Sequence, residues 1–153
     1  MQRYIKMRTK QNNSHFFLYY SRFAVPLHPQ NVIKMKDICC IGHVTKDKIV
    51  TPSSTVYMAG GTSFYFAYAI NQLPKDVSFS LITAMDPTEK EPVEKMLKAG
   101  IDVTLNPSRN TVFFENIYGD NPNDRKQRVL AKADPFTIQQ LEHVEAKVFH
   151  LGS

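Results

Sequence analysis

The sequence predicts an α/β domain with a largely parallel sheet, helices on both faces and a small β flap. Short apolar runs typical of buried strands alternate with segments of helical periodicity. The connections between these strands are long enough for crossovers, which parallel neighbours require. With 153 residues, 42% of them hydrophobic, the chain can bury one sizeable core.

The first strands follow from residues 37–58. DICCIG (37–42) is a continuous apolar run ending in glycine, the pattern of a strand buried on both faces. Its cysteines, Cys39 and Cys40, are neighbours and point to opposite faces, so they favour core positions over a metal or redox pair. Residues 46–50 and 54–58 predict two further short strands.

A double glycine separates these strands from a predicted helix. Residues 62–73 are long enough for three turns, and Thr62 or Ser63 can cap the first one. Apolar residues recur at helical spacing on the side expected to face the core. They are Phe66, Ile70 and Leu73.

The next strand and helix have clear boundaries. Residues 77–85 read as a strand, and the following helix is predicted to start with a capping box between Thr88 and Glu91. Gly100 follows the helical pattern as a stop. A strand over 101–105 comes next.

The last third predicts a hairpin over 110–131, with GDNPND as its turn, then a helix over 137–145 and a strand over 147–151. The strands at 46–58 and 110–131 do not follow the alternation. We expect them to form a separate antiparallel flap. We also expect the domain to be incomplete at its carboxyl end, because a parallel sheet needs both faces covered.

The positive charge of the chain is concentrated in residues 1–35. The formal net charge is +5, but this segment holds six basic residues and no acidic one, which leaves 13 basic against 14 acidic residues in 36–153. Such a distribution does not favour nucleic-acid binding by the domain. The apolar run of the segment is too short to span a bilayer and has no cleavage site. We predict a disordered or upstream extension, with the domain over 36–153 and the cytoplasm as default location.

The glycine pair Gly60–Gly61 admits two interpretations. No Gly-Lys-Ser/Thr follows it and the G-x-G-x-x-G spacing is absent, so it is neither nucleotide motif. It is either a plain turn or a place where a ligand approaches backbone N–H groups at a helix start.

Asp47 is the first polar candidate for a site. At the carboxyl end of a parallel strand its carboxylate could accept hydrogen bonds from two hydroxyls of a polyol, and a turn or cap role is the alternative. His43 with Asp47 is too few ligands for a metal site. His150 favours a core or edge position over a catalytic base.

Taken in order, the segments resemble the ribokinase-like, phosphofructokinase-B carbohydrate kinases. The likeness covers most of residues 36–153 and is carried by DICCIGHVTKD, VYMAGGTSFYFAYAINQL, SLITAMDPTEKEPVEKMLKAGIDV, NTVFFENIYGDNPNDRKQRVLAKAD and KVFHLGS. The resemblance implies a Rossmann-type sheet with a lid of strands that closes over a substrate.

The resemblance also implies a substrate site. Gly60 and Gly61 would form a backbone platform beside the pocket, and Asp47 matches the aspartate that holds substrate hydroxyls. Thr45 and Tyr65 stand where many members carry asparagine, so they would contact the substrate differently. This puts ribose in doubt, and a cyclitol stays open.

The catalytic part of the family is missing from this sequence. No Asp-x-x-Gly-Ala-Gly-Asp-like segment is present, so the resemblance implies ATP and Mg²⁺ for the intact relative only. We expect a substrate-binding and lid portion that is inactive alone, with a homodimer through the lid strands. The alternatives are a non-catalytic polyol-binding or regulatory module, and a membrane-associated protein held by its basic tail.

Overall fold

The computed structural model describes residues 17–20, 23–26, 35–74, 76–121 and 123–152. The chain divides into two units, Met1–Lys34 and Met35–Ser153. In the first unit β1 (Phe17–Tyr20) pairs antiparallel with β2 (Phe23–Pro26). The predicted disorder of residues 1–35 concerns mostly residues outside the described ranges. Within those ranges, no helix is both long and apolar enough to cross a bilayer.

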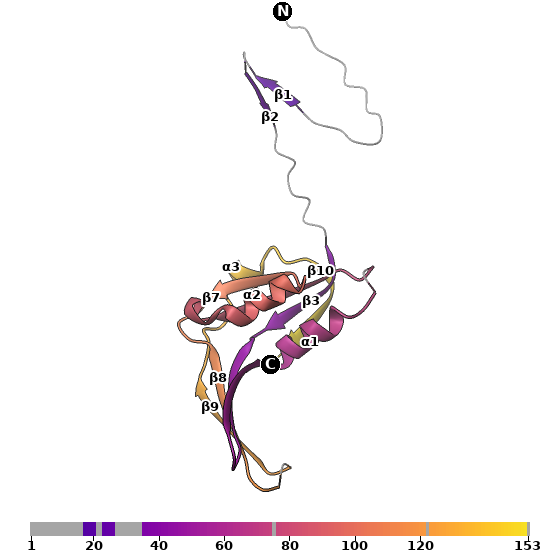
Figure 1. Ribbon diagram of the computed structural model, residues 1–153. Helices are drawn as coiled ribbons and strands as arrows, with labels where there is room; N and C mark the ends of the chain where they lie inside the picture. Colours follow the sequence, from indigo (N-terminus) through magenta and orange to yellow (C-terminus); the bar gives the residue numbers. More distant parts are fainter. Residues whose placement is uncertain (1–16, 21–22, 27–34, 75, 122, 153) are drawn as a thin grey trace, which may run out of the picture. The chain divides into compact units, whose positions relative to one another are not determined.

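The second unit is built on a four-stranded sheet in which all neighbours are parallel. Its order is β10–β3–β6–β7 (Figure 1). The strands span Ala146–Gly152 (β10), Lys36–Gly42 (β3), Phe79–Met85 (β6) and Val103–Pro107 (β7). The prediction of a largely parallel sheet is confirmed, and the continuous apolar runs lie in its centre.

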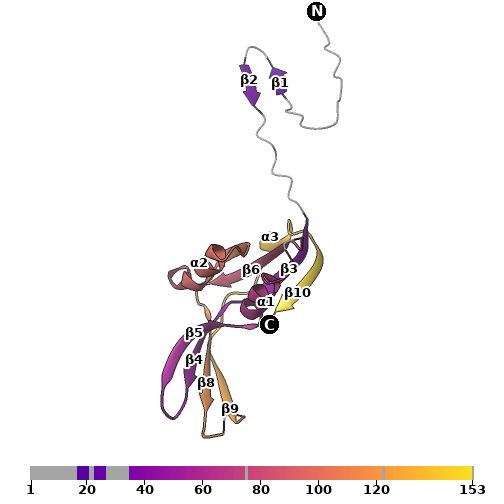
Figure 2. The same cartoon turned by 45° about the vertical axis from the view of Figure 1, so that its right-hand side comes forward.

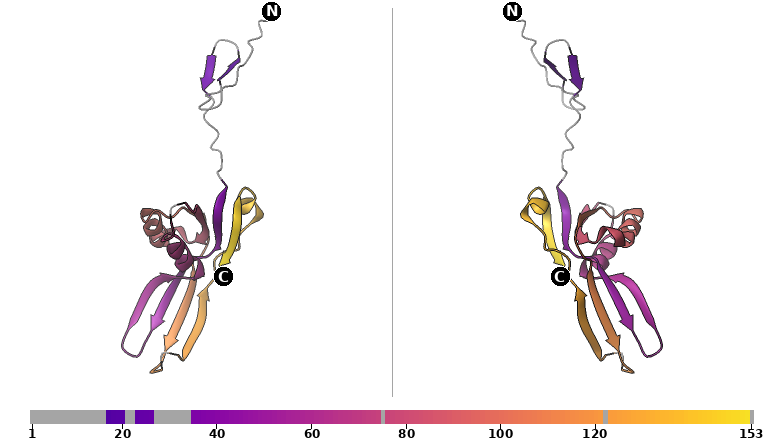
Figure 3. Two further views of the ribbon diagram at one scale, coloured as in Figure 1. Left: turned by 90° about the vertical axis from the view of Figure 1, so that its right-hand side faces the viewer. Right: turned by 90° about the vertical axis from the view of Figure 1, so that its left-hand side faces the viewer.

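Helices lie on both sides of this sheet, as predicted. The helices are α1 (Thr62–Ile70), the short 3₁₀ helix η1 (Pro87–Glu89), α2 (Glu91–Lys98) and α3 (Ile138–Leu141). Figure 3 shows α3 on the opposite side of the sheet from α1 and α2. The main core forms where α1 and α2 pack on β3 and β6. Its buried members are Cys40, Val44, Ala67, Leu81, Met85, Val93, Met96 and Ile101.

The two cysteines are fully buried and unpaired, which confirms their core role. The predicted helix over 62–73 is wrong at its end, because α1 stops at Ile70 and a turn follows. Leu73 is 45% exposed and is not a core residue. It directly precedes Pro74, and the residue before a proline is disfavoured in helical conformation.

Two predicted caps are also wrong. Gly61 is the N-cap of α1 and provides no side chain, so neither Thr62 nor Ser63 occupies that position. The N-cap of α2 is Lys90, which makes no side-chain cap, and Asp86 instead caps η1 by accepting a hydrogen bond from the Thr88 backbone N–H at 2.8 Å. A capping box does occur at Thr137, the N-cap of α3.

Four more strands form the lid sheet, which we define as β5–β4–β8–β9. They span Thr55–Gly60 (β5), Thr45–Val50 (β4), Val112–Tyr118 (β8) and Arg125–Ala131 (β9). Figure 2 shows them projecting from the carboxyl end of the parallel sheet. The expectation of an antiparallel flap is wrong at the centre, because β4 and β8 are parallel while the outer pairs are antiparallel.

A buried carboxylate joins three strands of the lid sheet. Glu115 on β8 accepts a hydrogen bond from Lys48 Nζ on β4 at 2.9 Å and from Arg128 Nε on β9 at 2.9 Å. These donors, Lys48 first, hold the pKa of Glu115 below its usual value. The ionised carboxylate therefore stabilises the lid sheet.

We expect Glu115→Gln to reduce the acid sensitivity of folding. Because the folded-state pKa is lowered, the stabilisation is complete above the unfolded-state pKa of about 4.3 and is lost as the pH falls below it. Urea midpoints at pH 7, 5 and 3 should therefore fall less steeply in the variant than in the wild type, from a lower starting point. Glu91→Gln is the control, since Glu91 makes one exposed pair with Lys95. Equal slopes in wild type and Glu115→Gln would contradict this role.

Candidate functional site at the carboxyl end of the sheet

The candidate site forms where β3 passes into the lid sheet. Only His43 and Val44 separate the end of β3 from the start of β4. This short connection places Thr45 as the first residue of β4 and Asp47 as its third. Asp47 was expected at the carboxyl end of a parallel strand, whereas it lies within β4 of the lid sheet. Thr45 and Asp47 therefore point to the same face of the lid sheet.

The Asp47 carboxylate lies directly against Gly60. Thr45 Oγ1 donates a hydrogen bond to Asp47 Oδ1 at 2.8 Å. A Cβ added to Gly60 would lie 2.4 Å from Asp47 Oδ2 and 3.0 Å from its Cγ. In the register of β4 and β5, Thr45 is the partner of Gly60. The structure thus brings three of the five sequence-predicted residues into contact.

Gly61 joins the same cluster through its backbone. Its φ of 94° and ψ of 151° belong to a region that residues with a side chain avoid. A Cβ there would lie 2.8 Å from the carbonyl oxygen of His43 and 3.0 Å from Thr45 Cγ2. The chain therefore needs glycine to turn from β5 into α1 at this place.

Tyr65 is placed differently from the other four. It lies on α1, is 55% exposed, and its ring meets that of Phe64 edge-on with centroids 5.3 Å apart. No described hydrogen bond joins it to Asp47. Its proposed contact with a substrate stays a prediction.

Lys46 lies on the opposite face of β4, which borders a pocket of about 290 Å³ whose lining also includes Thr45. Lys46 Nζ lies 2.5 Å from Glu89 Oε1 and 5.2 Å from the centre of the Phe113 ring. Lys46 is the largest cause of the lowered pKa of Glu89. Asp47 does not line this pocket, but Thr45, which donates a hydrogen bond to Asp47, does.

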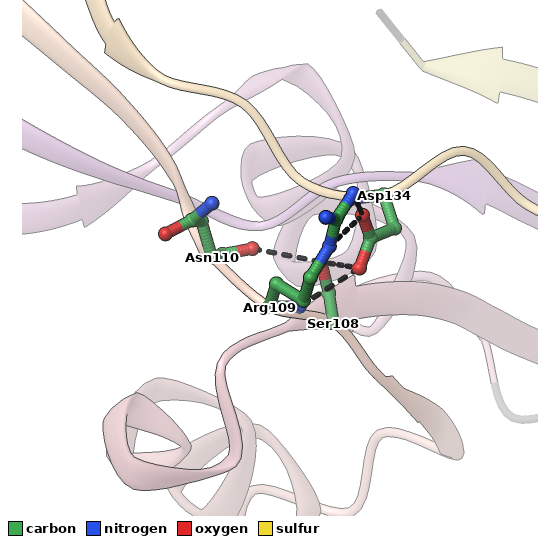
Figure 4. Close-up of polar contacts among 4 residues, drawn as sticks. All are labelled: Ser108, Arg109, Asn110 and Asp134. Atoms are coloured by element: carbon green, nitrogen blue, oxygen red, sulfur yellow. Dashed lines mark hydrogen bonds and ion pairs between the residues drawn. The ribbon is translucent and has the colours of Figure 1, made fainter.

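A clamp of polar contacts joins the two ends of the hairpin β8–β9. Asp134 accepts hydrogen bonds from Arg109 Nε at 2.9 Å, Arg109 Nη2 at 2.8 Å and the Arg109 backbone N–H at 2.9 Å (Figure 4). The Asp134 backbone N–H donates to Ser108 Oγ at 2.7 Å. The Arg109 guanidinium is the main reason that the pKa of Asp134 is lowered. The clamp fixes the hairpin where it leaves the parallel sheet.

The two histidines near the site lie against aromatic rings. His43 stacks on Phe136 with centroids 4.9 Å apart, and burial lowers its pKa, so the neutral imidazole is favoured. His150 stacks on Phe66 at 3.9 Å, in keeping with its predicted core or edge position. Within the described ranges no three His, Cys, Asp or Glu side chains gather in a way that could hold a metal ion.

Sequence reasoning missed the clamp and the Lys46–Glu89 pair. Arg109 and Asp134 are 25 residues apart, and each stands in a loop without a motif. The only available signal was that both flank the predicted hairpin. Pairs so distant in sequence become visible only once the strands are placed.

No known family model matches the sequence, and no curated protein matches it. Solved structures do match the fold. A pyrophosphate-dependent kinase in the ribokinase family, solved with a pyrophosphate analogue and myo-inositol, has 27% identity and a TM-score of 0.62 over 75% of this chain and 39% of its own. A sulfate complex of a pyrophosphate-dependent kinase in that family has 26% identity and a TM-score of 0.62, over 75% and 40%.

The chain shares the fold of the ribokinase-like carbohydrate kinases. A structure described as a pyrophosphate-dependent myo-inositol-1 kinase converted into a myo-inositol-3 kinase shares the fold, with 24% identity and a TM-score of 0.65 over 75% of this chain and 38% of its own. The ribokinase-like chain therefore spans about 40% of the length of the structures that it matches. Its parallel sheet and lid sheet are the part that they share.

Proposed function

We propose that this chain is the substrate-binding and lid portion of a kinase that phosphorylates an alcohol group of a sugar or polyol. The observation that carries the proposal is the Asp47 carboxylate, held by Thr45 and packed on Gly60 at the carboxyl end of the parallel sheet. Ligands of open α/β sheets bind at this end. The matched proteins are sugar and polyol kinases, which supports the substrate class.

The chemistry available to Asp47 is that of a hydroxyl acceptor. A carboxylate has several lone-pair positions, and Thr45 uses one of them, so others are left for vicinal hydroxyls of a substrate. Such contacts hold the reacting hydroxyl in line with a phosphoryl donor. The lid sheet beside it would exclude water when it closes.

The donor and its metal ion are assigned to no residue of this chain. The sequence has no Asp-x-x-Gly-Ala-Gly-Asp-like segment, and the described residues offer no metal cluster. ATP with Mg²⁺, or pyrophosphate as for the three matched kinases named above, would be bound by the rest of an intact protein. A polyol-binding module without transfer activity is the second candidate, since the contact of Asp47 with Thr45 and Gly60 would serve binding alone as well.

We further propose a homodimer through the lid sheet in the cytoplasm. Exposed apolar residues of the lid sheet support the dimer. The exposed residues are Val56, Tyr57, Met58, Val129 and Leu130. If the proposed homodimer is wrong, sedimentation of the purified chain will show a monomer.

A thermal-shift screen with sugars and cyclitols, myo-inositol included, tests the proposed site. A ligand at 100 times its Kd stabilises the folded state by about 2.7 kcal/mol, which raises Tm by several degrees. We expect Asp47→Ala to weaken the affinity at least tenfold, because hydrogen bonds to charged groups are strong. Asp120→Ala is the control, since Asp120 is exposed in the turn of the β8–β9 hairpin. A ligand that stabilises wild type and Asp47→Ala equally would overturn the assignment.

The same screen distinguishes the two candidate functions. A ligand that binds but is not phosphorylated by the purified chain in the presence of pyrophosphate or ATP fits both the isolated kinase portion and the binding module. Transfer restored by supplying the remaining part of a kinase fold would favour the first. Transfer by the chain alone would contradict the expectation that it lacks the catalytic group.

A further inference from the structure

The hydroxyl of Thr45 is already engaged by the protein. Thr45 is 5% exposed, and its Oγ1 donates to Asp47 Oδ1 at 2.8 Å. A threonine hydroxyl carries a single proton. While that proton is donated to Asp47, Thr45 cannot donate it to a bound molecule. Thr45 was expected to contact the substrate, but its hydroxyl instead contacts Asp47.

The surroundings hold the Thr45 side chain in one orientation. Its Oγ1 lies 3.3 Å from the Cβ position of Gly60 and 3.3 Å from that of Gly61, and its Cγ2 lies 3.0 Å from the latter. A β-branched side chain has few χ1 choices, and packing on both glycines leaves fewer. The hydroxyl is therefore presented to Asp47 from a fixed position.

The Asp47 carboxylate is held on two sides. Oδ1 accepts the Thr45 proton, and Oδ2 lies against the backbone of Gly60, 2.4 Å from where a Cβ would be. The lysines next to it in β4 are engaged elsewhere, Lys46 with Glu89 and Lys48 with Glu115. Alternation along the strand places both lysines on the other face of the lid sheet. The oriented donor to Asp47 in this arrangement is the Thr45 hydroxyl.

We propose that Thr45 is a positioning residue that acts on the substrate through Asp47. It fixes the rotamer of the carboxylate, so that the remaining lone pairs face the substrate hydroxyls. The effect of Thr45 on ligand binding rests on the proposed function. The orientation of the Asp47 side chain in the free protein does not depend on that function, so binding and orientation can be measured separately.

Three variants test the ligand-dependent part, with myo-inositol as the first probe and the strongest polyol of the screen as the second. Thr45→Val keeps the shape and removes the donor, and we expect affinity about tenfold weaker, as for loss of a hydrogen bond to a charged group. Thr45→Ser keeps the donor and should bind within about threefold of wild type. Thr55→Val is the matched control at the exposed far end of the same strand pair and should bind as wild type.

Three-bond couplings of the Asp47 side chain, measured by NMR without ligand, test the orientation itself. We expect a single χ1 rotamer in wild type and Thr45→Ser, and rotamer averaging in Thr45→Val. Averaging in the wild type, or a single rotamer in Thr45→Val, would overturn the proposal. So would undiminished affinity in Thr45→Val. If no polyol binds the wild type while the couplings behave as expected, the proposed function fails and the positioning role stands.

Discussion

Replacing Gly61 with alanine should lower the free energy of unfolding by about 2 to 4 kcal/mol. Part of this loss is conformational. The φ of 94° and ψ of 151° at Gly61 are sparsely populated by any residue with a Cβ, and such strain costs about 1 to 3 kcal/mol. The measurement is urea denaturation of the purified chain.

The remaining part is steric. The new methyl group would lie 2.8 Å from the His43 carbonyl oxygen, which belongs to the backbone between β3 and β4 and cannot rotate away. Overpacking of this kind typically costs about 1 to 3 kcal/mol. The total loss of unfolding free energy should exceed either contribution alone. Partial relaxation of the loop should keep this total below the sum of the two upper values.

Two other glycines separate the two causes. Gly100 has a φ of 85° but no atom within 4 Å of its Cβ position, so Gly100→Ala should cost about 1 to 2 kcal/mol for conformation alone. Gly119 has neither a positive φ nor a close neighbour, and Gly119→Ala should stay within about 1 kcal/mol of wild type. A loss at Gly61 no larger than that at Gly100 would show that the contact with His43 relaxes without cost.

The parallel sheet could be predicted because burial on both faces leaves a clear trace in sequence. DICCIG and SLITAM are continuous apolar runs, and they became β3 and β6 at the centre of the sheet. The end of α2 was also predictable, since Gly100 adopts the positive φ that such a stop requires.

The pairing inside the lid sheet could not be predicted from local patterns. β4 and β8 are neighbours in space but 67 residues apart at the pair Lys48–Glu115. A turn identifies the antiparallel pairing of the two strands that it joins. No local sequence pattern shows that two hairpins join through a parallel strand pair. The caps failed for a related reason. Several residues near Asp86 and Gly61 can cap a helix, and only the backbone path selects among them.

The resemblance supplied the positions of the candidate site, and their role in binding a substrate stays a prediction. Asp47 and Gly60 were expected to border one pocket, and the structure places them in contact. The spacing of residues in the sequence does not predict that Thr45 orients that carboxylate. It does not predict the Arg109–Asp134 clamp either. Both depend on which atoms meet after the strands are in register.

Gly60→Ala should cost at least tenfold in affinity for any polyol that Asp47 binds, with a smaller loss of stability, about 1 kcal/mol. The added Cβ would meet Asp47 Oδ2 at 2.4 Å, and that atom is the end of a side chain that can swing away from the site. The movement that removes this clash from the folded state therefore also takes the carboxylate away from its ligand. Calorimetric titration with the polyol and urea denaturation measure the two effects.

The double variant Gly60→Ala/Asp47→Ala identifies the cause. If the carboxylate is what the new methyl group meets, most of the stability cost of Gly60→Ala disappears once Asp47 is alanine, and the two changes are coupled. The remaining neighbour, Thr45 Oγ1, lies 3.3 Å from the Cβ position and needs only a small shift. Additive costs would instead mean that Gly60 is required for the backbone of β5 and not for the room that it gives to Asp47.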